Sequence, residues 1–147
     1  MNKKIVAAII ALITIAIITG IWIIYINKDK LETFDSKNIN LQKSDKLYID
    51  VLDDTVTGTS LNYKIYNNTD TTVSYGVSYE IEKYEDGKWK EFGVEVSFIE
   101  IAIELESGYS KEEIIEWKST YGKLKKGKYR LIKEVMGETL FDEFEIK

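Results

Sequence analysis

The pattern of apolar and polar positions divides the chain into three parts. An unbroken apolar run extends from Ile5 to Ile26 and contains no charged residue. From Leu47 onward, apolar and polar residues alternate in short runs, which is typical of half-buried β-strands. The polar stretch between these parts shows little periodicity. The pattern therefore predicts an apolar helix within residues 1–27, a polar linker over 28–46 and a β-domain over 47–147.

As a helix, the apolar run measures about 33 Å, against about 30 Å for the hydrocarbon core of a bilayer. A cleaved signal peptide is one alternative, but the small residue Gly20 has Ile18 two positions before it, which fits a cleavage site poorly. A buried core helix is another, but bulky residues on every face leave no amphipathic stripe. We therefore predict one N-terminal transmembrane helix that contacts the lipid bilayer through residues 5–26.

The charges around this run bear on its orientation. Lys3 and Lys4 precede it and Lys28 and Lys30 follow it, so the count of basic residues is nearly balanced. A short N-terminus before a first apolar helix usually stays inside the cell. We therefore expect a single-pass protein of the cell membrane, with its C-terminal domain extracytoplasmic.

The alternating runs predict short strands in the second part of the chain. They are Leu47–Val51, Leu61–Ile65, Tyr75–Ile81, Ile99–Leu105, Tyr129–Val135 and Leu140–Ile146. Asp86-Gly87 predicts a two-residue hairpin turn, because both positions of a type I′ turn need positive φ. Many short strands with frequent turns favour an all-β antiparallel sandwich, although another small antiparallel barrel fits the same pattern.

One pair of residues favours an immunoglobulin-like sandwich. Tyr129 stands two residues before Leu131, which is the spacing of the tyrosine corner and the central core position of strand F. We expect the Tyr129 hydroxyl to bond a nearby backbone group. We expect Leu131 to be buried between two sheets, beside the inward residues Tyr63, Ile101 and Trp117.

Four segments after Ser74 resemble a known family. They are the hairpin over residues 79–89 with its Asp-Gly-Lys-Trp, the strand at Trp117, the Tyr-Gly-x-Leu-x-x-Gly-x-Tyr-Arg of residues 121–130, and the closing Phe-Glu-Ile of residues 144–146. Over about half of its length the chain thus resembles the bacterial Ig-like domains of membrane-anchored envelope proteins in Gram-positive bacteria. The resemblance implies an immunoglobulin-like antiparallel β-sandwich, used as a spacer or a binding module, and no shared activity.

Composition and charge exclude several classes of function. The net charge is −5, and it is −7 for residues 28–147 because Lys3 and Lys4 are the only charged side chains before them. Such an acidic domain is repelled by phosphate backbones, so nucleic acid is not an expected partner. Cys and His are absent, which removes thiolate sites and the commonest general base.

No catalytic or metal motif appears in what remains. The acidic cluster Asp50, Asp53 and Asp54 lacks the pattern of a calcium loop, and we expect it to be a solvated strand end. The serines have no histidine partner and no Gly-x-Ser-x-Gly elbow surrounds any of them. We therefore predict that the protein is not an enzyme and has no catalytic residues, metal ligands or cofactor.

Two groups of residues form a candidate interaction surface: Tyr84, Trp89, Lys123, Lys125, Lys126 and Lys128. In the predicted hairpin, Tyr84 faces Trp89 on the outer side, where the pair either only stabilises the hairpin or also contacts a partner or sugar ring. The basic run that ends at Arg130 either solvates a corner of the sandwich or docks on anionic polymers or lipid headgroups.

The function predicted from the sequence is that of a non-catalytic module at the cell surface, anchored by one helix and serving protein interaction or structural spacing. A module that binds wall glycan or a divalent ion is the alternative. The partner is an envelope protein or a glycan, which the sequence does not identify.

Overall fold

The computed structural model describes residues 3–27, 31–38, 40–99 and 101–147. It divides into two compact units, Met1–Leu31 and Glu32–Lys147. The first unit contains one long helix and the second contains all the strands. Each unit is described separately.

The helix of the first unit, α1, covers Lys3–Asn27 and so confirms that the apolar run is helical. Its described apolar side chains are largely exposed, from 46% for Ile9 to 67% for Leu12, with Trp22 at 64%. A search of the described residues nevertheless finds no helix that is both long and apolar enough to cross a membrane. The transmembrane part of the prediction for residues 5–26 is therefore not supported, and Lys28 and Lys30 lie outside the described residues.

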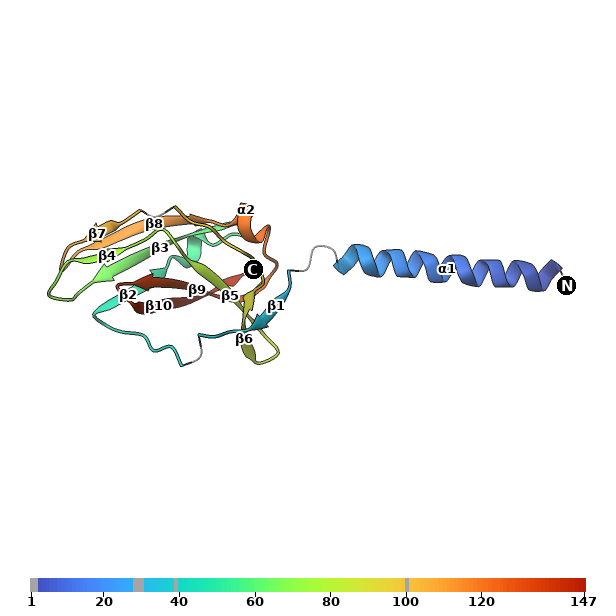
Figure 1. The fold of residues 1–147 in the computed structure, drawn as a ribbon, viewed down its shortest axis with the longest axis horizontal. Helices are drawn as coiled ribbons and strands as arrows, with labels where there is room; N and C mark the ends of the chain where they lie inside the picture. The colour runs from blue at the N-terminus through green and yellow to red at the C-terminus, as the bar shows by residue number, and fades with distance from the viewer. Residues whose placement is uncertain (1–2, 28–30, 39, 100) are drawn as a thin grey trace. The chain divides into compact units, whose positions relative to one another are not determined.

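The second unit consists of two antiparallel sheets, visible as two layers in Figure 1. The larger sheet has the order β1-β6-β5-β9-β4-β7, with β10 paired to β9, and the smaller sheet has the order β2-β3-β8. The elements are β1 (Thr33–Asp35), β2 (Leu47–Val51), η1 (Asp53–Thr55), β3 (Ser60–Asn67), β4 (Val73–Tyr75), β5 (Glu80–Glu85), β6 (Lys88–Phe92), β7 (Ile103–Leu105), β8 (Ser110–Glu116), α2 (Lys118–Tyr121), β9 (Gly127–Val135) and β10 (Glu138–Ile146). The predicted all-β antiparallel sandwich is confirmed.

The core lies where the inward residues of the two sheets meet. Leu131 and Trp117 are fully buried and Tyr63 is 1% exposed, as the alternation predicted. Ile101 was expected beside them, but 46% of its surface is exposed. The expected core residues are thus confirmed, except Ile101.

The predicted strand Ile99–Leu105 is wrong over its first half. Only Ile103–Leu105 form a strand, β7, which pairs with β4 in a register that ends at Tyr75↔Ile103. Between Tyr75, the end of β4, and Glu80, the start of β5, the chain is not in a strand. Ile101 therefore has no neighbouring strand there to pair with. Alternation alone cannot reveal that a partner strand is interrupted.

The interruption of the predicted strand Tyr75–Ile81 has an identifiable cause. Over Gly76–Tyr79 the backbone is irregular, and the ammonium of Lys133 donates to the carbonyl oxygens of Gly76 at 2.8 Å and Ser78 at 2.7 Å. Lys133 is 1% exposed and points inward from β9. The two carbonyl oxygens therefore satisfy the buried ammonium of Lys133 with hydrogen bonds.

The stability of the fold should rise with pH through this buried ammonium. Burial lowers the pKa of Lys133 from 10.5 to about 8, and Glu113 opposes that shift. Because the native pKa is lower, the unfolded chain binds more protons between these values, and the free energy of unfolding increases with pH. We expect a gain of about 1–2 kcal/mol between pH 7.5 and 9.5, measured by urea unfolding.

The Lys133→Met variant serves as the control for this gain, and its unfolding free energy should not rise over the same range. The pKa values of the facing Tyr63 and Tyr75 are raised, first by burial. Both hydroxyls therefore stay protonated in the native state up to pH 9.5, while in the unfolded chain they begin to ionise, so the tyrosines slightly lower the free energy of unfolding and do not produce a rise. An equal pH dependence in the variant and the parent protein would assign the effect to other groups.

Residues before 47 also contribute to the compact unit that contains the strands. The compact unit already begins at Glu32, and β1 pairs with β6 in the register Thr33↔Phe92 to Asp35↔Lys90. The segment from β1 to β2 then follows the β6–β9–β10 side of the sandwich, as Figure 1 shows. The described residues from Glu32 to Lys46 therefore belong to the β-domain.

The hairpin at Asp86-Gly87 forms as predicted. Both residues have positive φ, 55° and 78°, which is the requirement of a type I′ turn. The register pairs Glu85 with Lys88 and Tyr84 with Trp89. The local turn chemistry thus fixes which face of each strand is outward.

The tyrosine corner is also present. The Tyr129 hydroxyl donates a 2.7 Å hydrogen bond to the carbonyl oxygen of Lys125, four residues earlier. The Tyr129→Phe variant should therefore lose about 1 kcal/mol of unfolding free energy, the typical net value of one such bond. Chemical denaturation measures this loss. The Tyr84→Phe variant, at an exposed tyrosine, is the matched control, and an equal loss there would contradict a special role for the corner.

Candidate functional site

The outer face of the larger sheet brings together three of the predicted surface residues. Tyr84 and Trp89 pair across β5 and β6, with ring centroids 5.1 Å apart in an edge-to-face arrangement. Tyr84 is 42% exposed and Trp89 is half-buried. The Lys128 ammonium lies 5.4 Å from the Tyr84 ring centroid and 5.5 Å from that of Trp89. The predicted outward aromatic pair is confirmed, and Lys128 joins it.

This pair belongs to a longer row of rings and cations. The Arg130 guanidinium lies 4.5 Å from the Trp89 ring centroid and 6.0 Å from that of Phe141 on β10. We call the row Tyr84–Trp89–Arg130–Phe141 the ladder. Each cation–ring contact in such a row contributes about 0.5–1 kcal/mol or more when desolvated. The ladder therefore holds Trp89 in a fixed orientation across four strands.

A buried ion pair anchors the centre of the ladder. Arg130 Nε donates to Glu82 Oε2 at 2.7 Å, from a cross-strand position in the β5–β9 register. Glu82 Oε1 accepts from the Ser36 hydroxyl at 2.6 Å and from the Asn38 amide at 2.8 Å. Arg130 Nη2 also donates to the Asn38 carbonyl oxygen at 2.7 Å. The pair is thus fully hydrogen-bonded, which a buried charge requires.

The same contacts fasten the segment 36–41 over the outer face of the sheet. Ser36 is buried and Asn38 half-buried, and both are bound to Glu82. Farther along, Lys43 forms an ion pair with Asp142, whose other carboxylate oxygen accepts from the backbone N–H of Val51 at 2.8 Å. The segment is therefore held at both ends by carboxylates of the β-domain.

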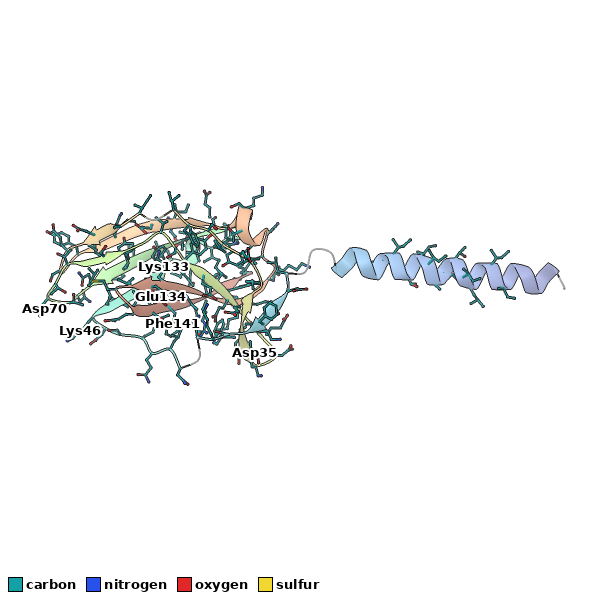
Figure 2. All side chains as sticks on the ribbon, viewed as in Figure 1. Asp35, Lys46, Asp70, Lys133, Glu134 and Phe141 are labelled. Atoms are coloured by element: carbon teal, nitrogen blue, oxygen red, sulfur yellow. The ribbon has the colours of Figure 1, made fainter. Side chains whose placement is uncertain are left out.

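A hollow of about 540 Å³ lies between this segment and the ladder. Its lining includes the ladder residues Trp89, Arg130 and Phe141 and, from the segment 36–41, Asn38, Asn40 and Leu41. Figure 2 labels Phe141 on β10 and Asp35 on β1, which also belongs to the lining. We call this feature the hollow. Its volume lies within the range of small-molecule sites, about 300–1,000 Å³.

The structure does not bring the rest of the basic run to this surface. Lys123, Lys125 and Lys126 are exposed in the segment that precedes β9. Lys125 contributes its carbonyl oxygen to the tyrosine corner rather than its ammonium to the ladder. Of the six predicted surface residues, the ladder region therefore contains Tyr84, Trp89 and Lys128.

One group of carboxylates has the spacing of a metal site. Oxygen atoms of Glu80, Glu82 and Glu91 lie within 4.8 Å of one another. The Lys37 ammonium lies 3.6 Å from Glu80 and 3.7 Å from Glu91, and Arg130 binds Glu82. Each of the three carboxylates thus already has a protein cation beside it, with Lys37 shared by two of them, which does not favour a divalent ion. Asp50, Asp53 and Asp54, the other acidic cluster, are exposed.

Sequence reasoning missed Glu82, Arg130 and Phe141 as parts of a site. Arg130 appeared only as the end of a basic run, although it is 4% exposed. One signal was available, because Arg130 lies between the inward residues Tyr129 and Leu131, on the outer face of β9. Its partner Glu82 could not be identified, since the pairing of β5 with β9 is non-local.

The arrangement described here suits binding rather than catalysis. The Arg130 guanidinium is bound to Glu82, and the Trp89 ring contacts both Tyr84 and Arg130. The Ser36 hydroxyl at the hollow donates to the Glu82 carboxylate, but that carboxylate is already paired with Arg130. What the surface offers is a rigid aromatic floor with a polar rim.

Comparisons with known proteins identify the family of the chain. A search of curated proteins finds no match. A solved structure of the Pseudomonas fluorescens alkylpurine DNA glycosylase AlkC, bound to DNA containing an abasic site analogue, is 18% identical, with a TM-score of 0.41. The alignment covers 71% of this chain and 31% of that chain, so the match spans about a third of the glycosylase. The family model described as Bacterial Ig-like domain matches residues 43–145. The chain therefore belongs to the bacterial Ig-like domain family.

Proposed function

We propose that this chain is a non-catalytic interaction module of the bacterial cell surface, and that the outer face around Tyr84, Trp89 and Lys128 is its contact surface. The ladder is the observation that carries the proposal. Amphipathic rings held rigidly at a surface bind partners at low cost in conformational entropy. Ig-like domains are typically non-catalytic, which agrees with the absence of Cys and His from the sequence.

The partner is an envelope protein or a glycan rather than a nucleic acid. The net charge of −7 over residues 28–147 disfavours phosphate backbones. Of the basic run, only the Lys128 ammonium lies beside the aromatic pair, and Lys123, Lys125 and Lys126 are exposed outside this surface. Structural spacing between the cell and such a partner is compatible with the same surface.

A sedimentation assay tests the contact surface. The full chain, held in zwitterionic detergent, is mixed with isolated Gram-positive envelope and the bound fraction is measured. The Trp89→Leu variant should lose most of the binding, because it removes the ring and keeps apolar volume. The Tyr48→Leu variant removes one ring of the stacked pair Tyr48–Tyr66 on the other sheet, and it should bind as the parent does. Equal binding by all three proteins would reject this surface.

Pretreating the envelope with protease separates the two kinds of partner. Loss of binding after proteolysis assigns the partner to the proteins of the envelope. Retained binding assigns it to the glycans. In either case the dependence on Trp89 remains the test of the surface.

We also propose that residues 5–26 associate with the lipid bilayer and that the β-domain lies outside the cytoplasm. The exposed Ile and Leu side chains of α1 support this, since apolar surface favours leaving water at about 25 cal/mol per Å². The full-length form should stay with membranes after a carbonate wash. A reporter fused to Lys147 should be active outside the cell. A shortened, freely soluble main species would identify a cleaved signal peptide instead.

A further inference from the structure

The hollow beside the ladder has the composition of a site for an uncharged polar ring. Trp89 and Phe141 give it two aromatic surfaces, and Leu41 adds an aliphatic one. Polar groups stand at its edge: Asn40 is exposed and its amide has no hydrogen-bond partner among the described residues. The Asn38 amide nitrogen donates to Glu82, so the side-chain oxygen of Asn38 is the atom that can accept a hydrogen bond from a ligand. A pyranose ring is complementary to such a site, because it has apolar C–H faces and carries hydroxyl groups around its edge.

The charged groups around the hollow are already paired within the protein. Asp35 accepts from Lys88 at 3.0 Å, and Glu143 lies 2.6 Å from Lys128. Arg130 is bound to Glu82, as described above. A charged ligand would have to compete with one of these pairs, whereas a neutral ligand would not. The charge pattern therefore selects against acidic and basic ligands.

The hollow is also organised before any ligand binds. Trp89 is held between Tyr84 at 5.1 Å and Arg130 at 4.5 Å. The segment with Ser36 and Asn38 is fixed by the buried carboxylate of Glu82. Side chains that are already ordered lose little entropy when a ligand binds, and so a small contact area can suffice.

We propose that the hollow is a binding site for one uncharged sugar ring of a glycan, with the ring in contact with Trp89 and Phe141 and its hydroxyl groups bound by Asn38 and Asn40. The inference rests on the proposed function, because it names the ligand of the same surface. It assigns the glycan, and not an anionic polymer or a protein, to the ladder.

Calorimetric titration of the full chain in zwitterionic detergent tests this assignment. The probe is the neutral tetramer of β-1,4-linked N-acetylglucosamine. Its deacetylated, cationic form and a tetramer of galacturonic acid are the charged comparisons. We expect saturable binding of the neutral tetramer that is at least about tenfold tighter than either charged one.

Variants locate the binding in the hollow. Trp89→Leu and Phe141→Leu should each weaken binding of the neutral tetramer by about tenfold or more, while Trp89→Phe should retain part of it because a ring remains. Tyr48→Leu, which removes an aromatic side chain from the other sheet, should leave it unchanged. Unfolding curves of each variant establish that it is folded.

Three results would overturn the inference: no binding of the neutral tetramer, preferential binding of a charged tetramer, or binding that survives Trp89→Leu. Failure here does not remove the proposed function, because Trp89-dependent sedimentation with envelope, sensitive to protease, would still identify a protein partner. If sedimentation with envelope is also unchanged in the Trp89→Leu variant, both the proposed contact surface and the sugar site in the hollow are rejected.

Discussion

The Arg130→Met variant is expected to lose about 3–5 kcal/mol of unfolding free energy, the typical effect of breaking a buried ion pair from one side. The substitution leaves the carboxylate of Glu82, which is 0% exposed, without its cation. Ser36 and Asn38 still donate to that carboxylate but carry no charge to balance it. Urea unfolding of the full chain, followed by tryptophan fluorescence, measures the loss.

Two further variants make this result specific. Lys88→Met breaks the pair with Asp35, in which both side chains are about two-thirds exposed, and should cost only about 0–1 kcal/mol. Adding Glu82→Gln to Arg130→Met should recover part of the loss, because the uncompensated charge is then gone. Equal losses for Arg130→Met and Lys88→Met would show that burial of the pair has no energetic consequence.

The elements that sequence analysis predicted well are those that short-range chemistry fixes. Asp86-Gly87 requires positive φ wherever it stands between two strands, so the Tyr84–Trp89 pair followed from the turn alone. The two-residue spacing of Tyr129 and Leu131 likewise identified the corner and the core position. In the hairpin pair and in the tyrosine corner, the interacting residues lie within five positions of each other.

The features that it missed depend on partners far away in the chain. The bond between Arg130 and Glu82 joins residues 48 positions apart, and that between Ser36 and Glu82 joins residues 46 apart. The segment Glu32–Lys46 appeared to be a linker because its polar residues show no period, yet its polar groups bind polar groups of the sheet. Hydrophobic periodicity predicts which apolar faces are buried, but it does not predict hydrogen bonds between polar side chains and a sheet.

Lys133 illustrates the same limit within the core. Its inward position on β9 follows from alternation with Leu131 and Val135, and a lysine there contradicts an apolar core. The lysine is accommodated there because its ammonium donates hydrogen bonds to the carbonyl oxygens of Gly76 and Ser78. The break in the predicted strand Tyr75–Ile81 and the buried lysine are therefore one feature, which neither segment reveals separately.

Trp89 has a structural role and a proposed binding role, and these affect different measurable quantities. The ladder needs its ring for contact with Tyr84 and Arg130. The hollow needs the same ring as a binding surface. The structural role predicts a modest cost in hairpin stability, about 0.2–1 kcal/mol for the cross-strand pair, whereas the binding role predicts lost affinity. Measuring stability and binding on the same Trp89→Leu sample separates the two contributions.

The second large effect is expected in the core, at Leu131. Its side chain is fully buried on β9, opposite Ile81 on β5 and Asp142 on β10. The Leu131→Ala variant should lose about 2–5 kcal/mol of unfolding free energy, because a cavity remains where close-packed atoms stood. Chemical denaturation of the full chain gives this value.

An exposed aliphatic residue provides the matched control for that truncation. Ile114 on β8 is 62% exposed, so Ile114→Ala should change the unfolding free energy by no more than about 0.5 kcal/mol. The contrast between the two variants measures burial with side-chain size held constant. A Leu131→Ala variant with an unchanged unfolding midpoint would mean that β9 turns its other face to the core, and the positions of Arg130 and the ladder would then be wrong as well.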